Sequence, residues 1–325
     1  MHRARPGHFL RGVVAERLNI PIQSLKNTKS HAKARIGELD ACKSRLRGRC
    51  MMPAGGDGAH TAGLALRAAA CRTAALLRKV PDPNAAVPGL DWNAAQTAAH
   101  LVAELQIYAG LVGGIVDSRD DIVVADGVAA ADHRTAANAR HLKHFAERDM
   151  SKLADMLVPA VDAFLTATSV RNADERIRTP AGRAMTLSTL TRLLLGEQLI
   201  HALDIARAAR VTWAISKADA LQVVGGVMSI VPDYIDRDRA AGQRAAYELR
   251  FRGGPRYRLL VDDGTAIITP AGGPVDCWIS ADPAAFLLVG YGRLSQWSQI
   301  LRGRMMVGGL KPWLALGFGR LLIGA

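Results

Sequence analysis

A carboxylate and an imidazole stand four residues apart, at Glu197 and His201, within an otherwise apolar segment of the chain. In an α-helix this spacing places both side chains on one face, a single turn apart. Imidazole nitrogens and carboxylate oxygens are common ligands of first-row divalent metals. Burial of an unpaired carboxylate costs free energy, and metal coordination would offset that cost. The pair is therefore a candidate metal site, and the alternative is an exposed hydrogen-bonded pair on a helix surface.

A second pair with the same spacing, His100 and Glu104, lies in another apolar segment. If the two helices are antiparallel neighbours, His100 can meet Glu197 and His201 in a common core. Metal–ligand distances then require the ring nitrogens of His100 and His201 to lie within roughly 4 Å of each other. We expect Glu104 to lie outside the ligand set or to reach it only through water. The spacing excludes the HExxH metalloprotease motif and the Glu-x-x-His pattern of di-iron bundles.

The elements that would position these residues are long helices. Apolar residues recur at intervals of three and four from Thr61 onward, with Asp91 as the expected N-cap of the second helix. Short loops between long helices are typical of an antiparallel bundle. The expected helices are 61–80, 91–116, 133–168, 186–209 and 216–240, and loops are expected at 117–131 and at 179–182.

From Ala245 the apolar period changes from 3.6 to 2, which indicates short strands joined by Gly-rich turns. Asp282-Pro283 predicts the N-cap and first position of a helix that follows the strands. A further short helix at 295–301, a strand near 303–307 and a terminal helix from about 309 complete the chain. The expected fold class is α+β, with a four-helix bundle at 61–242 and a smaller α+β domain at 243–325.

The positive charge is concentrated at the start of the chain. Residues 1–50 contain twelve Lys and Arg against three Asp and Glu, so they carry nine of the thirteen net positive charges. Nucleic-acid binding by the folded part is therefore not expected. We expect residues 1–60 to be a disordered basic leader, or the product of a start codon assigned upstream of Met51 or Met52.

The four cysteines are scattered and form no CxxC pair, which is typical of a reduced cytoplasmic protein and argues against a zinc ribbon. No apolar run reaches the length of a transmembrane helix. We therefore expect a cytoplasmic protein without a transmembrane segment.

Two segments resemble the DinB-like, mycothiol-dependent maleylpyruvate isomerase family. The first is Gly89-Leu90-Asp91-Trp92 followed by Ala98-Ala99-His100-Leu101, and the second is Thr179-Pro180-Ala181-Gly182 followed by Gly196-Glu197 and His201-Ala202-Leu203-Asp204-Ile205-Ala206. The resemblance implies that His100, Glu197 and His201 bind one divalent metal, commonly zinc. It also implies a role for Asp204 in orienting a ligand imidazole. The alternative for Asp204 is an ordinary charge on a helix surface.

The resemblance further implies a reaction. Three protein ligands leave a fourth position on the metal, where the thiol of mycothiol would bind as a thiolate. The thiolate would add to an electrophilic carbon of a small substrate, and in the isomerase elimination returns the trans isomer. None of the four cysteines lies at a matching position, so an internal thiol nucleophile is not expected.

The C-terminal part resembles the sterol carrier protein type 2 fold, through the segment 280–288, Gly292-Arg293 and the glycines from Gly303 to Gly308. That resemblance implies an apolar tunnel, and in the isomerase family a related domain closes over the metal. Arg293 would then pair with a carboxylate of the substrate or cofactor, the alternative being a loop arginine in solvent. Gly309 departs from the acidic or amide residue that is usual there.

These features predict a metal-dependent, mycothiol-type transferase or isomerase that acts on a small electrophilic substrate. The alternative function is a non-catalytic carrier that holds a lipid or acyl ligand in the C-terminal tunnel.

Overall fold

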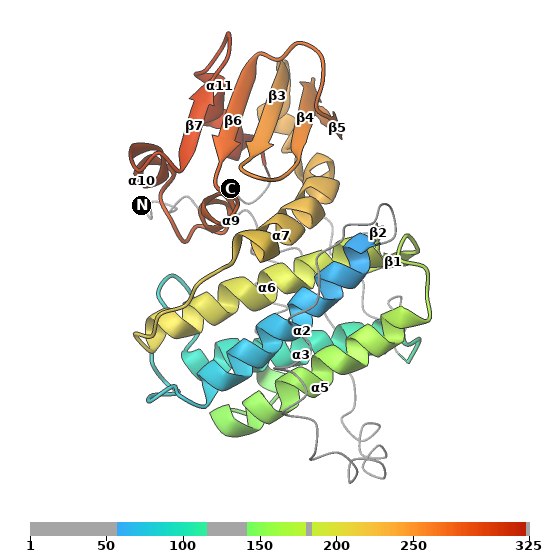
Figure 1. The fold of residues 1–325 in the computed structure, drawn as a ribbon, viewed down its shortest axis with the longest axis vertical. Helices are drawn as coiled ribbons and strands as arrows, with labels where there is room; N and C mark the ends of the chain where they lie inside the picture. The colour runs from blue at the N-terminus through green and yellow to red at the C-terminus, as the bar shows by residue number, and fades with distance from the viewer. Residues whose placement is uncertain (1–56, 116–141, 180–183, 323–325) are drawn as a thin grey trace.

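The computed structural model describes residues 57–115, 142–179 and 184–322. The expectations for the leader up to residue 56, for the loop at 117–131 and for residues 180–182 lie outside the described residues. Elements are labelled as in Figure 1.

Four long helices form the first part of the molecule: α2 (Asp57–Leu77), α3 (Ala94–Val112), α5 (Met150–Ser169) and α6 (Leu187–Ala208). Helix α2 contacts α5 and α6, and α3 contacts the same two helices. The helices therefore close into a four-helix bundle (Figure 1), which confirms the expected architecture. A short hairpin of β1 (Arg176–Arg178) and β2 (Ala184–Thr186), which the sequence pattern did not indicate, precedes α6.

The prediction of Asp91 as the N-cap of α3 is wrong, because Asn93 occupies that position. Asn93 Oδ1 accepts a hydrogen bond from the Gln96 backbone N–H (2.8 Å), and Gln96 Oε1 accepts one from the Asn93 N–H (2.9 Å). This reciprocal capping box satisfies two backbone donors at once, so the helix begins at Ala94.

Helix α6 is the most enclosed helix of the described chain. It packs against α2 and α3 in the bundle and against α7 (Lys217–Ile230) on the side of the C-terminal part. As a result its polar residues are buried together with its leucines, and Gln198, for example, is only 1% exposed. Polar groups on α6 must therefore find partners inside the protein.

The predicted helix at 216–240 is broken into three pieces. Helix α7 ends at Ile230, and the 3-10 helix η2 (Val231–Tyr234) and the short helix α8 (Arg237–Ala240) follow it. Pro232 lies in η2 and has no backbone N–H, so it cannot continue the hydrogen-bond ladder of α7.

A five-stranded sheet forms the C-terminal part, in the order β5-β4-β3-β6-β7. Strands β3 and β6 are parallel, and the other neighbouring pairs are antiparallel. With the helices this gives the expected α+β fold class. The strands are β3 (Arg244–Phe251), β4 (Arg256–Asp262), β5 (Thr265–Pro270), β6 (Cys277–Ala281) and β7 (Met305–Gly308).

One face of the sheet is buried and the other is open. Tyr247, Leu249 and Phe251 alternate with Glu248 and Arg250 along β3, and only the first three are buried. The buried face packs against α9 (Pro283–Gly290) and against the 3-10 helix η3 (Phe318–Leu321), through ring contacts from Phe251 to Phe286 and from Tyr247 to Phe318.

The remaining elements are α10 (Gln296–Leu301) and α11 (Leu314–Gly317). Asp282 caps α9 by accepting the Ala285 N–H, as predicted, whereas the expected terminal helix from 309 is reduced to α11 and η3. None of the helices in the described ranges combines the length and the hydropathy that a membrane span requires.

Candidate metal centre

The structure brings together His100, Glu197 and His201, the three residues expected to bind metal. His100 comes from α3 and the other two from α6, and their exposed fractions are 2%, 4% and 7%. One potential ligand atom of each residue lies within 4.8 Å of the other two. The two imidazole rings are nearly perpendicular, with centroids 5.2 Å apart. The side chains converge because α3 and α6 are neighbours in the bundle.

The hydrogen bonds around His201 fit a cation. His201 Nδ1 lies 3.2 Å from Asp204 Oδ2, and Nε2 lies 3.2 Å from Glu197 Oε2. When Nδ1 donates its hydrogen to Asp204, Nε2 presents a lone pair to the carboxylate, so a proton or a metal is needed between the two acceptors. The second oxygen of Glu197, Oε1, is buried and accepts no hydrogen bond from any described residue. Two imidazoles and one carboxylate form a donor set that suits zinc.

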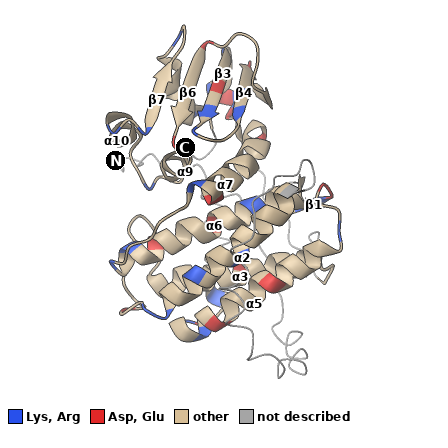
Figure 2. Cartoon of the chain, viewed as in Figure 1, with Lys and Arg blue, Asp and Glu red and all other residues tan. Residues whose placement is uncertain are grey.

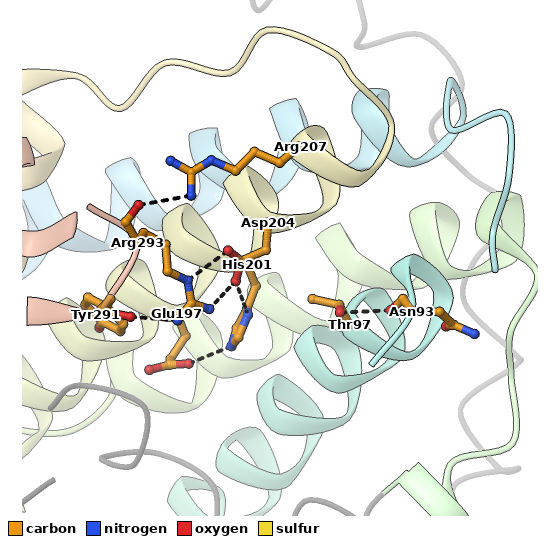
Figure 3. Close-up of polar contacts among 8 residues, drawn as sticks. All are labelled: Asn93, Thr97, Glu197, His201, Asp204, Arg207, Tyr291 and Arg293. Carbon is orange, nitrogen blue, oxygen red and sulfur yellow. Dashed lines mark hydrogen bonds and ion pairs between the residues drawn. The ribbon is translucent and has the colours of Figure 1, made fainter. Parts of the chain in front are cut away.

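Asp204 and Arg293 form a buried ion pair beside His201 (Figure 3). Arg293 Nε donates to Asp204 Oδ1 (2.9 Å) and Nη2 donates to Oδ2, in a bidentate arrangement, while Nη1 donates to the Tyr291 carbonyl (2.7 Å). The side chains are 0% and 2% exposed, so Asp204 is not a surface charge and Arg293 is not a loop arginine in solvent. The assignment of Arg293 to cofactor binding stays a prediction.

Burial and hydrogen bonding act in opposite directions on these groups. Burial alone would raise the pKa of Asp204, but hydrogen bonds from His201 and Arg293 lower it to about 2. Burial would likewise lower the pKa of His201, but hydrogen bonds to Asp204 and Glu197 hold that pKa above its usual value. Asp204 is therefore a fixed negative charge in hydrogen-bond contact with the His201 ring.

Residues 66–206, from α2 to the end of α6, match the family model described as the mycothiol maleylpyruvate isomerase N-terminal domain. The match covers most of the helical bundle, which is therefore similar to that domain. No curated protein matches the sequence of the chain.

Three solved structures illustrate how far the similarity extends. The crystal structure of the mycothiol-dependent maleylpyruvate isomerase is 15% identical, covers 74% of this chain and 90% of its own, and superposes with a TM-score of 0.46. A single-substitution variant of that isomerase is 13% identical over 78% of this chain and 92% of its own, with a TM-score of 0.47. The apo form of sterol carrier protein 2 from Yarrowia lipolytica is 13% identical over 27% of this chain and 86% of its own, with a TM-score of 0.21.

Two aromatic residues beside this candidate centre were not selected from the sequence as site residues. The Trp92 ring centroid lies 5.0 Å from that of His100 and 6.2 Å from that of His201. Trp92 directly precedes Asn93, the N-cap of α3, so its position at the start of this helix could be predicted from the local sequence. Tyr291 approaches α6 closely, since a Cβ at Gly196 would lie 2.9 Å from the tyrosine hydroxyl oxygen. No local sequence pattern links Tyr291 to Gly196, because the two residues are far apart in the chain.

Glu104 adds a second buried carboxyl group near the centre, at 3% exposure. It does not belong to the group of three converging residues. Burial, and then the charge of Glu197, raise its pKa well above the usual range. Its Oε1 has no hydrogen-bond partner among the described residues.

Proposed function

We propose that this chain is a metal-dependent enzyme that uses a mycothiol-type thiol to isomerise, or to transfer the thiol onto, a small electrophilic substrate. The observation that carries the proposal is the convergence of His100, Glu197 and His201 in the bundle core, with ligand atoms within 4.8 Å of one another. The match to the mycothiol isomerase domain supports the choice of thiol and of reaction class.

His100, Glu197 and His201 would hold the metal, and zinc suits two imidazole nitrogens and one carboxylate oxygen. A bound divalent metal would lower the pKa of a coordinated thiol, so that the cofactor is a nucleophilic thiolate near neutral pH. Three protein ligands are typical of a catalytic site, because one coordination position stays open to the cofactor.

The surrounding residues would orient the centre and limit the access of water. Asp204 would keep the hydrogen on His201 Nδ1, so that Nε2 presents its lone pair on the side of Glu197. The Trp92 ring lies beside both imidazole rings, and the Tyr291 hydroxyl lies against α6 at Gly196. Arg293 balances the charge of Asp204, and a carboxylate of the substrate or cofactor is its proposed further partner.

Metal content tests the centre directly. We expect about one zinc per chain in the purified protein, and a loss of that zinc in His201→Ala and Glu197→Gln. Gln preserves the shape of Glu but removes the anionic ligand. The matched control is Glu248→Gln, which alters a carboxylate on strand β3 that makes no contact with the centre.

Isomerisation of maleylpyruvate in the presence of mycothiol tests the reaction. Activity that depends on both the thiol and the metal supports the proposal. A protein with full zinc content in both ligand variants would remove these residues from the ligand set. A purified protein that carries lipid and no metal would favour the carrier alternative.

A further inference from the structure

An open hollow of about 400 Å³ lies on the outer face of the C-terminal sheet, where β3 ends and β4 begins. Its lining includes Arg250, Arg252 and Arg256, with Trp278 and Met306 from β6 and β7. Figure 2 shows basic positions at these strand ends, which face α7. None of the lining residues belongs to the candidate metal centre.

Strand register brings the three arginines to one place. Arg250 lies opposite Arg256 on the antiparallel strand β4 and beside Ser280 on the parallel strand β6. Arg250 belongs to the outward-facing set of β3 residues, and Arg252 follows in the turn between the strands. Lys217, at the start of α7, lies against this turn, because a Cβ at Gly253 would lie 2.3 Å from Lys217 Nζ.

Two of the arginines are held in place by the protein. Arg250 Nε and Nη2 donate to the two oxygens of Glu248 at 2.9 and 3.3 Å, and its guanidinium lies 4.7 Å from the Trp278 ring centre. Arg252 Nη2 donates to the Gly303 carbonyl at 2.5 Å. Each guanidinium has five N–H donors, so both keep donors for a ligand.

The third arginine is free to move toward a ligand. Arg256 Nη1 lies 3.6 Å from Glu248 Oε1, and its side chain is 64% exposed. Glu248 is the only carboxylate that these three arginines contact within the described residues, so three positive charges face one negative charge. The three arginines and Glu248 together therefore carry a net charge of about +2.

An apolar wall stands beside these charges. The Trp278 indole lies across strand β7 at Gly308, where a Cβ would approach the ring to 2.3 Å. Met306, one of the lining residues, is 51% exposed. The lack of a side chain at Gly308 thus lets the ring lie flat, and the hollow combines a flat apolar surface with arginine donors.

We propose that this hollow binds a small dianion with a flat apolar body, of the phosphomonoester class. A phosphomonoester carries about −1.5 to −2 charges at neutral pH, which matches the net charge of the arginine cluster. The volume falls within the range of about 300–1,000 Å³ that is usual for small-molecule sites. Planar guanidinium groups bind phosphate oxygens in a bidentate manner, which favours arginine over lysine here.

Calorimetric titration of the full chain with phenyl phosphate tests the site. We expect saturable binding that is at least tenfold weaker for benzoate, a monoanion with the same ring. Arg256→Gln should weaken phenyl phosphate binding about tenfold, because one charge-assisted contact is lost. The matched control is Arg244→Gln, at the other end of β3 on the same face, where the side chain is 82% exposed and pairs with Asp262. That variant should bind like the wild type.

Two results would overturn the proposal. One is the absence of saturable binding at millimolar phenyl phosphate, and the other is an equal loss in Arg256→Gln and Arg244→Gln. A phosphate could also be presented by a lipid headgroup, so vesicles of phosphatidic acid in phosphatidylcholine form a second arm. If the chain binds these vesicles but not phenyl phosphate, and Arg256→Gln loses the vesicle binding, the ligand is a lipid phosphate and the small-molecule proposal is wrong. Zinc content should be unchanged in all these variants, so failure here is distinguishable from failure of the metal centre.

Discussion

The buried pair between Asp204 and Arg293 joins the helical bundle to the segment that follows α9, and its removal should have a large and non-additive effect. Both side chains are almost fully buried, and two parallel hydrogen bonds connect them. Removing one partner of such a pair leaves an uncompensated charge, at a cost of about 3–5 kcal/mol. Arg293→Met should therefore reduce the free energy of unfolding by about that amount. Asp204→Asn should cost less, because the amide oxygen can still accept one bond.

The double variant Asp204→Asn/Arg293→Met removes both charges, so it should cost clearly less than the sum of the two single variants. We expect a coupling energy of about 2–3 kcal/mol, near the upper end of the range for contacting residues. Urea unfolding of the four proteins, with EDTA present, measures this quantity. EDTA is needed because a metal that binds only the folded state adds its own stabilisation.

The Arg67–Asp162 pair provides a matched control. It joins α2 to α5 at 2.7 Å, but its side chains are 47% and 44% exposed. Solvent screens such a pair, so its coupling energy in the same cycle should be no more than about 1 kcal/mol. Equal coupling in the two pairs, or strict additivity at Asp204 and Arg293, would refute the reasoning from burial.

Three further predictions follow from the packing, the charge distribution and the ionisation of buried groups. Burial raises the pKa of Tyr247 to about 12, so the unfolded chain releases the phenolic proton at a lower pH than the folded chain does. The free energy of unfolding should therefore fall by about 1.4 kcal/mol per pH unit between pH 10 and 12. Tyr247→Phe should lose less stability than the wild type between pH 9 and 11 in urea unfolding, and equal losses would contradict the assignment. Gly196→Ala should destabilise by about 1–3 kcal/mol, because the new Cβ would lie 2.9 Å from the Tyr291 hydroxyl. Gly225→Ala, with its nearest neighbour at 3.8 Å, should be neutral or stabilising, so similar melting temperatures for the two variants would be inconsistent with this packing. A chain that starts at Met51 should melt at the same temperature as the full chain, because the charge-rich leader has no apolar periodicity; a clear decrease would indicate that the leader packs on the body.

The domain boundaries at 61–242 and 243–325 stay predictions. Limited proteolysis is a direct measurement for them, since cleavage near 243 that releases two stable fragments would support separate domains. Cleavage elsewhere, with the junction protected, would favour one cooperative unit held by contacts such as that between Asp204 and Arg293.

Local spacing was sufficient to place the residues that lie within one element. Glu197 and His201 share a face because any α-helix brings positions four apart together, and the structure has them on α6. The change of period at Ala245 predicted strands, because successive side chains of a strand alternate between its two faces. Asp282-Pro283 marked the start of α9. The grouping of His100 with this pair was predicted from the expected antiparallel packing of two helices and from the family resemblance.

Contacts between distant segments were decided only by the tertiary structure. Arg293 meets Asp204 across 89 positions, Tyr291 meets Gly196, and β3 pairs in parallel with β6. The N-cap of α3 at Asn93, by contrast, is a local contact, because its capping box needs only Gln96 three residues later. The arginine hollow depends on the register of β3 with β4. Such contacts leave no periodic signal in the sequence, because the free energy that selects them comes from burying side chains of separate elements against one another.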